Sequence, residues 1–446
     1  MKFLQTVLMI LIPMELFAIP DNESDSANVD KATTPSLSLE DCLLIGLEEN
    51  LQLKNQRINV KQSELRKNIY NRALLFPDIN TSGRLSSVYS EGDKPRIRQS
   101  IRAFTNFTIF DWEIGPRKRK LNNFILLNKY FRDAEAANLQ REIAVAYIQA
   151  NLVRKKQDIM LQQLLELDSL YELSLATEDV PDINKEAIFR LRNNIEPLQE
   201  AIQTQLKGLE TNYDDRIGEL NNLMSLDNSH NFRLADELKL SEIVVENENQ
   251  FINRLIDQSI EVRSTDDNLR KQNLEEDMKI VNAVFFPDID AGISYEQDFM
   301  TQFQGFSVNL LVNYNVYDPN ARKRKDLARL DIESINNSIL DNKRNIERVI
   351  RGNYNKSNEF RSQVRPSLVE AQRNLYLSNL EEFLGGKMIT VSATDVVNSF
   401  RNYYEARHEY YENIASAEIH ITNIRFYLMD FVSPFNELGT VPYTLK

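Results

Sequence analysis

The sequence has few of the residues that bridge, bend or punctuate a compact enzyme domain. Its 446 residues include one cysteine, 12 glycines and 13 prolines. The single cysteine, Cys42, excludes an intrachain disulfide, and with three histidines the chain offers no cluster of zinc ligands. It also lacks a phosphate-binding glycine loop and a nucleophile elbow. We therefore expect no catalytic, cofactor-binding or metal site, no enzyme activity, and long helices with few interruptions.

Positive charge is also in deficit. The chain has 53 basic against 66 acidic residues, a formal net charge of −13. Because nucleic acids are bound through clustered lysine and arginine, we expect no nucleic-acid partner. After the N-terminus there is no apolar run of about 18 residues, the length that a membrane-spanning helix needs. We therefore expect no membrane helix in the mature protein, which leaves a soluble protein or a β-barrel.

The two ends of the chain differ from the rest. Residues 1–18 have an early lysine, a mostly apolar stretch and the small residue Ala18, which is typical of a cleaved signal peptide. The alternative is a buried first helix. Residues 19–36 are small and polar, as in a disordered leader, and 433–446 form a C-terminal tail. Cys42 lies too far beyond the cleavage position to carry a lipid anchor.

Three landmarks occur twice in the same order. LEENLQLK at 47–54 matches IDQSIEVR at 256–263, LFPDI at 75–79 matches FFPDI at 285–289, and FDWEIGPRKRK at 110–120 matches YDPNARKRK at 317–325. Matched landmarks in a constant order indicate internal duplication. We predict a first structural repeat at 37–225, a linker or equatorial segment at 226–250 and a second structural repeat at 251–432.

Within each repeat the spacing of the apolar residues changes from the period of a helix to the period of two residues that is typical of a strand, and then returns to the helical period. In FSVNLLVNYNVY at 306–317 every second residue from Phe306 to Val316 is apolar, and most residues between them are polar. This alternation predicts β-hairpins, with strands at about 78–112 and about 288–318. Strands of about ten residues can cross a bilayer when tilted, with the apolar face outward. The alternative is a soluble hairpin packed on a helical body.

The segments after the hairpins return to helical spacing. No glycine or proline occurs from Arg117 to Val180. From Phe400 to Phe431 apolar residues recur alternately three and four positions apart, a heptad seam that Arg407 interrupts. Such helices are stable only when they pack side by side, so we predict a long helical hairpin after each pair of strands.

These motifs, in this order, resemble the TolC-like outer membrane efflux proteins over nearly all of the chain from Leu37 onward. The resemblance rests on LSLEDCLLIGLEENLQLK at 37–54, on the two FPDI turns, on the two basic returns from strand to helix and on FLGGKMITVSATDVVNSF at 383–400. It implies a mainly α fold with a small β part, built from a duplicated helix–β-hairpin–long-helix-hairpin unit. It also implies a homotrimer whose 12-stranded β-barrel continues into a long periplasmic α-helical coiled-coil barrel.

The same resemblance implies a passive channel-tunnel in the outer membrane of a diderm bacterium. It would export small molecules or proteins, as in type I secretion. Its partners would be an inner-membrane pump of the resistance-nodulation-division or ABC type, a periplasmic adaptor (membrane fusion) protein and outer membrane lipid. Four strands cannot close a barrel, since small membrane barrels start at about eight, so this function needs several chains. The alternative is a periplasmic coiled-coil scaffold protein with no channel.

The resemblance also implies two sets of site residues at the ends of the helical hairpins. Asp395 would form an acidic ring at the tunnel entrance, and Asn398 would occupy a second position there. The adaptor-docking tips would include Asp179, Asp182 and Gly386. An alternative role for Asp395 is to stabilise the first turn of its own helix.

The chain departs from the family pattern at three places. Asn50 is followed by Leu51, where the family usually has proline. The spacing from Gly386 to Asp395 is about three residues longer than expected, and the first-repeat tip lacks the expected glycine. These differences concern the details of adaptor docking and not the architecture.

Two basic clusters recur at matched positions where strands return to helices. Cations at the start of a helix oppose its dipole, so helix capping does not explain them. We expect them near the inner-leaflet headgroups of the outer membrane, where basic side chains attract phosphates. A solvated run of charge is the alternative. The clusters are Arg117, Lys118, Arg119 and Lys120 in the first repeat, and Arg322, Lys323, Arg324 and Lys325 in the second.

Overall fold

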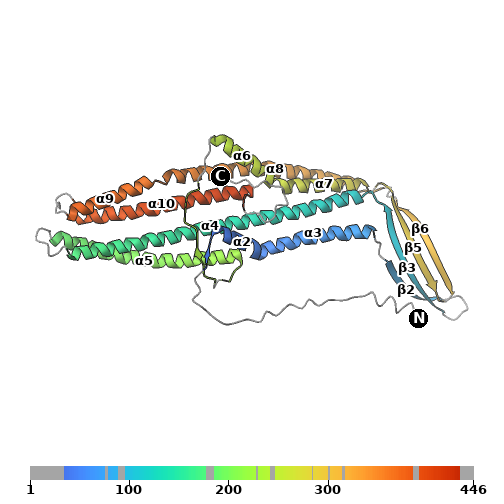
Figure 1. Cartoon of the computed structure of the whole chain (residues 1–446). Coiled ribbons are helices and arrows are strands. Elements are labelled where there is room, and N and C mark those ends of the chain that lie inside the picture. Colours follow the sequence, from blue (N-terminus) through green and yellow to red (C-terminus); the bar gives the residue numbers. More distant parts are fainter. Residues whose placement is uncertain are drawn as a thin grey trace. The chain divides into compact units, whose positions relative to one another are not determined.

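The structure is a computed structural model, and most of the chain that it describes is helical (Figure 1). The mainly α fold with a small β part is thus confirmed. All secondary-structure elements belong to the compact unit Ser36–Lys446. The described residues are 35–75, 79–88, 96–176, 185–227, 230–241, 247–283, 285–299, 302–313, 317–384 and 391–431.

The order of helices and strands along the chain is as follows. The helices are α2 (Leu39–Glu49), α3 (Leu51–Leu75), α4 (Ile114–Ala176), α5 (Lys185–Met224), α6 (Glu248–Arg263), α7 (Thr265–Ala283), α8 (Ala321–Gln363), α9 (Pro366–Leu384) and α10 (Ala393–Leu428). The main strands are β2 (Ile79–Val88), β3 (Arg96–Phe110), β5 (Asp288–Asp298) and β6 (Phe303–Asn313). A short parallel pair joins β1 (Ser36–Leu37) to β4 (Arg233–Leu234).

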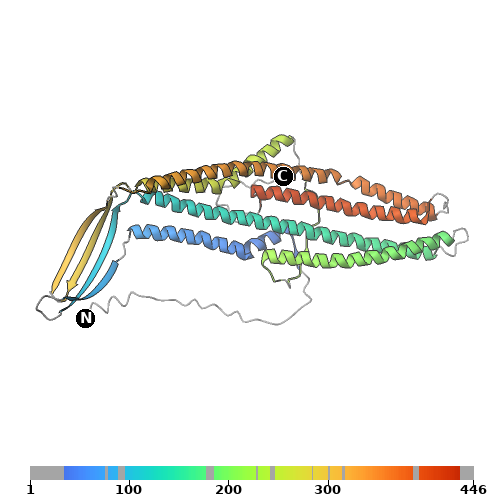
Figure 2. The same ribbon diagram turned by 180° about the vertical axis from the view of Figure 1, so that it is seen from behind.

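The long helix α4 connects two groups of helices. It has 63 residues, which is about 95 Å of helix at 1.5 Å per residue. Its first half packs between α3 and α7, where Asn128 donates a hydrogen bond to Ser63 and Arg119 pairs with Glu276. Its second half packs on α5 and α10 in a buried core that includes Ile159 and Leu167. Figure 2 shows α4 running along both groups.

The heptad seam in α10 explains why this helix lies inside its group. Arg407, which interrupts the seam, lies beside the rings of Tyr403 and Tyr404, with its guanidinium carbon 5.6 and 5.4 Å from the ring centroids. It also donates a hydrogen bond of 2.7 Å to Gln162 of α4. The cation is thereby held between aromatic faces and a polar neighbour. The buried seam residues are Phe400, Tyr403, Ile414, Ala417, Ile421, Ile424 and Leu428.

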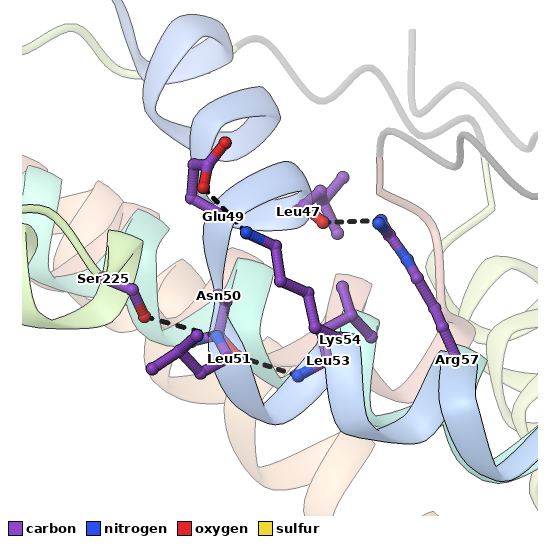
Figure 3. Close-up of polar contacts among 8 residues, drawn as sticks. All are labelled: Leu47, Glu49, Asn50, Leu51, Leu53, Lys54, Arg57 and Ser225. Carbon is purple, nitrogen blue, oxygen red and sulfur yellow. Dashed lines mark hydrogen bonds and ion pairs between the residues drawn. The ribbon is translucent and has the colours of Figure 1, made fainter. Parts of the chain in front are cut away.

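Asn50 breaks the first helical segment into α2 and α3 without a proline (Figure 3). Its Nδ2 donates to the carbonyl of Leu223 at 2.9 Å, and its Oδ1 accepts the backbone N–H of Leu53 at 3.0 Å. Arg57 donates to the carbonyl of Leu47 at 2.7 Å, which satisfies an acceptor at the end of α2. One asparagine therefore ends one helix and caps the next, and this accounts for the break at Asn50-Leu51.

The main sheet has four antiparallel strands in the order β2-β3-β5-β6. Each hairpin pairs within itself, and β3 pairs with β5 from Ser100 opposite Asp298 to Thr108 opposite Asp290. A bulge follows Thr108. The two edge strands, β2 and β6, each have a neighbour in the sheet on one side only.

Candidate functional site

The four-stranded sheet has one apolar face. Its register places Val308 opposite Ile293, and Ile293 in turn opposite Thr105. In the described part of the chain these strands pack mainly on one another and not on a helix. Val308 and Leu310 are each 67% exposed and Ile79 is 78% exposed. The apolar face comprises Ile79, Leu85, Ile101, Ala103, Phe107, Ile289, Ala291, Ile293, Tyr295, Phe306, Val308, Leu310 and Val312.

The opposite face of the same sheet is polar. Ser294 and Ser307 share a hydrogen bond of 2.7 Å across β5 and β6, and Arg102 lies 3.5 Å from Ser294. Apolar residues that interrupt this face include Phe104, Phe303 and Leu311. Its polar residues are Asn80, Ser82, Arg84, Ser100, Arg102, Asn106, Thr108, Asp290, Ser294, Glu296, Asp298, Ser307 and Asn309. The sheet is therefore amphipathic, with an apolar and a polar face along all four strands.

The sheet also has two open edges. One side of β2 and one side of β6 have no strand beside them among the described residues. Unpaired backbone N–H and C=O groups on such edges require water or another strand. No described helix is long and apolar enough to cross a membrane.

Asp395 lies in the first turn of α10, where it forms a capping box with Ser392. Its carboxylate accepts hydrogen bonds from Ser392 N at 2.9 Å and from Ser392 Oγ at 2.7 Å, while Asp395 N donates to Ser392 Oγ at 3.3 Å. The hydrogen bonds from Ser392 lower the pKa of Asp395 below its ordinary value. Asn398 is exposed one turn later on the same helix. Asp179, Asp182 and Gly386 lie outside the described residues.

The two basic clusters begin with the same local chemistry. Asp111 Oδ1 accepts the N–H of Glu113 at 2.6 Å, and the matching Asp318 Oδ1 accepts the N–H of Asn320 at 2.9 Å. A carboxylate near each cluster also binds one of its arginines: Glu113 binds Arg117, and Asp318 binds Arg324. These acidic groups offset part of the unfavourable interaction between the cations and the helix dipole.

The first cluster has two further partners, on α7. Arg119 Nε donates to Glu276 Oε2 at 2.9 Å, and Lys120 Nζ to Asp277 Oδ1 at 2.5 Å. Burial alone would raise the pKa of Glu276, but hydrogen bonds from Lys279 and Arg119 outweigh it and lower this pKa. Sequence reasoning missed these ion pairs, because nothing in the spacing of the motifs indicates which helix lies beside α4. Within the described residues the cluster members without an ion pair are Lys118, Arg322, Lys323 and Lys325.

Groups that could support catalysis are few in the described part of the chain. No three His, Cys, Asp or Glu side chains there lie close enough together to hold a metal ion. Cys42 is fully buried, and burial raises the pKa of its thiol to about 12, so it stays protonated at neutral pH.

His408 makes the stability of the helical part depend on pH. Burial lowers its pKa to about 4, and Lys156 and Arg407 add to this effect while Glu412 opposes it. Between pH 6.5 and about 4 the unfolded chain therefore binds a proton that the folded chain does not, so the free energy of unfolding falls as pH falls through this range. Over this range we expect the free energy of unfolding of the unmodified protein to fall by about 1–2 kcal/mol, after a discount for partial solvent screening. We expect His408→Gln to remove this fall.

Urea unfolding at pH 7.5 and pH 4.5 measures this effect. His230→Gln, at an exposed position, serves as the matched control. An equal loss of stability at low pH in the His408→Gln and unmodified proteins would show that other groups cause it.

The chain was compared with known proteins at three levels. No protein-family model matches it, and no curated sequence matches it either. The chain does match solved structures. Its match to a membrane protein from Pseudomonas aeruginosa covers 89% of this chain and 91% of that protein's chain, with 12% sequence identity and a TM-score of 0.70.

Two similar structures are described as outer membrane proteins. The open state of the MtrE outer membrane channel of Neisseria gonorrhoeae has a TM-score of 0.69 and 13% identity, and it covers 88% of both chains. The outer membrane protein VceC of Vibrio cholerae has a TM-score of 0.68 and 11% identity, and it covers 87% of this chain and 95% of that one. The resemblance to TolC-like outer membrane efflux proteins is therefore confirmed at the level of the fold.

Proposed function

We propose that the protein is an outer membrane channel-tunnel and that its four-stranded sheet crosses the bilayer as part of a shared barrel. The amphipathic sheet carries this proposal, because no described helix packs as a layer on either of its faces and one face is apolar along all four strands. Lipid would cover the apolar face and water would fill the space beside the polar face. The similarity to MtrE, an outer membrane channel, supports the same function.

A homotrimer would close the sheet. In lipid no open strand edge can remain, because nothing there satisfies the backbone groups. Edge β6 of one copy would pair with edge β2 of the next, and three copies would give a 12-stranded barrel. The duplication of the unit supports this arrangement: a helix, two strands and a long helical segment recur in the same order around β2-β3 and β5-β6. The pairing of β6 with β2 between copies would then be equivalent to the pairing of β3 with β5 within one chain.

The helical part would form the periplasmic tunnel. A cleaved signal peptide at 1–18 would direct the chain to the periplasm, and the tips with Asp179, Asp182 and Gly386 would meet an adaptor protein. An inner-membrane pump of the resistance-nodulation-division or ABC type would supply the small molecules or proteins that pass through. Export would be passive, without bond chemistry in this chain. The coiled-coil scaffold without a channel remains the second candidate, although it gives no reason for an amphipathic sheet.

The mass of the protein in mild detergent tests the assembly. A particle of about three chains that is extracted only by detergent supports the shared barrel. A single chain that washes off membranes without detergent would favour the scaffold and contradict the channel.

Ion selectivity tests the tunnel entrance. If three copies place Asp395 around a narrow mouth, we expect Asp395→Asn to lower the preference for cations over anions in planar bilayers. Asparagine keeps an acceptor for Ser392 and removes only the charge. Because the pKa of Asp395 is lowered, we expect the preference to persist as pH falls and to be lost below the ordinary range of an aspartate. Unchanged ion selectivity in Asp395→Asn would indicate that the only role of the Asp395 carboxylate is to cap its own helix.

A further inference from the structure

The two basic clusters have the same sequence but different surroundings. In the first repeat, Arg119 and Lys120 of α4 bind Glu276 and Asp277 on the neighbouring helix α7. In the second repeat, the matching residues lie on α8, whose described neighbours are α6, α7 and α10. None of the main described neighbours of α8 is a second helix equivalent to α7, which is the helix that covers the first cluster on α4. Among the described residues the second cluster therefore has no equivalent of the Glu276 and Asp277 pairs.

The duplication identifies which residues would face cluster two in a ring of copies. In the first repeat the helix that corresponds to α7 is α3, because 47–54 matches 256–263 and LFPDI matches FFPDI. The positions that correspond to Glu276 and Asp277 are 66–68, and they hold Arg66, Lys67 and Asn68. Where one junction has two carboxylates, the other has two cations. Neither Arg66 nor Lys67 forms an ion pair with a described residue.

The junction between copies would therefore collect positive charge. Lys325, which corresponds to Lys120, would lie near Arg66 and Lys67 of the next copy, and Arg322 and Lys323 share the first turn of α8 with it. Asp326, the next carboxylate along α8, already pairs with Arg329 at 3.6 Å. Five cations without matching carboxylates repel one another unless an anion lies between them. Three such junctions would surround the base of the barrel.

The apolar surface beside this junction identifies the anion as part of a lipid. Tyr317, four residues before the first residue of α8, is 76% exposed. Trp112 and Phe286 form a tilted ring pair at 4.9 Å on the same end of the sheet, and both are about half exposed. A surface with an apolar belt next to a cationic one fits acyl chains next to phosphate. A free phosphate would bind only the cationic surface and would leave the apolar surface unused.

We infer that the junction between the start of α8 in one copy and the end of α3 in the next binds the phosphate headgroup of an anionic phospholipid, through Arg322, Lys323 and Lys325 on one side and Arg66 and Lys67 on the other. This inference rests on the proposed trimer. It assigns the binding of the phosphate headgroup to the second cluster, because the charges of the first cluster are largely neutralised by ion pairs within the chain.

Native mass spectrometry of the detergent-solubilised full chain tests the inference. Phosphatidylglycerol and phosphatidylcholine with the same acyl chains are titrated in turn. We expect the trimer to bind phosphatidylglycerol more tightly, and we expect Arg322→Gln/Lys323→Gln/Lys325→Gln to reduce this preference by about tenfold or more. Arg66→Gln/Lys67→Gln should reduce it as well, although these residues lie on the other flank of the chain. Lys343→Gln/Arg344→Gln/Arg348→Gln, further along α8, is the control of equal charge and should keep it.

Each outcome is decisive. Equal binding of both lipids by an intact trimer overturns the lipid inference and leaves the channel proposal standing. A mass of one chain contradicts both the lipid inference and the channel proposal. Displacement of the lipid by millimolar inorganic phosphate would assign the site to free phosphate and overturn the lipid. A second measurement guards against misfolding: phosphatidylglycerol should raise the thermal stability of the unmodified trimer and leave that of the triple variant unchanged.

Discussion

Leu310→Arg is expected to keep the protein out of the outer membrane, whereas Asn309→Arg is expected to insert normally. The two residues are neighbours near the middle of β6 but lie on opposite faces of the sheet, because side chains alternate along a strand. Leu310 belongs to the apolar face and is opposite Ala291, while Asn309 belongs to the polar face and is opposite Gly292. An arginine facing lipid near the bilayer midplane costs about 2–4 kcal/mol. In a trimer the cost recurs three times, about 6–12 kcal/mol.

Membrane fractionation followed by urea washing measures this difference. The two variants carry the same new charge on the same strand, so a difference in synthesis or in signal processing would affect both alike. Equal insertion of both variants would show that the apolar face does not meet lipid, and the scaffold would then be the better explanation of the fold.

The sequence predicts the fold largely because the period of its apolar residues is unambiguous. A period of two around Phe306–Val316 and a heptad spacing from Phe400 onward can each be satisfied by one kind of element only. The pairing of β3 with β5 is different in kind, since these strands lie in separate hairpins and no turn fixes their register. Their alignment follows from the apolar face as a whole, which must be continuous across both hairpins.

The candidate sites were less predictable than the fold, because charges act through neighbours that are distant in sequence. The four-residue clusters at 117–120 and 322–325 are identical, yet only the first has Glu276 and Asp277 beside it. The capping role of Asp395 could be anticipated from Ser392 three residues earlier, which is the spacing of a capping box. An entrance role depends on other copies of the chain and stays a prediction.

Phe400→Ala is expected to destabilise the end of the helical part that holds Asp395. Phe400 is 1% exposed, and its ring contacts those of Tyr376 at 5.3 Å and Tyr404 at 4.9 Å between centroids. Truncation would leave a cavity among α9, α10 and α4, with a cost of about 3–5 kcal/mol. Phe189→Ala, on α5 in the same group of helices, is the control, because Phe189 is 56% exposed.

Hydrogen exchange locates this loss along the molecule. The core around Phe400 shares no buried residue with the core formed by Ile252, Ile350 and Ile424. Helices that contact only their neighbours lose stability locally, so amides of α9 and of the first turns of α10 should exchange faster while those of α6 keep their protection. Faster exchange in α6 as well would indicate that the helical part unfolds as one unit. In that case a substitution at the hairpin end would also weaken the sheet, and the effect of Asp395→Asn on selectivity would have to be measured in proteins matched for stability.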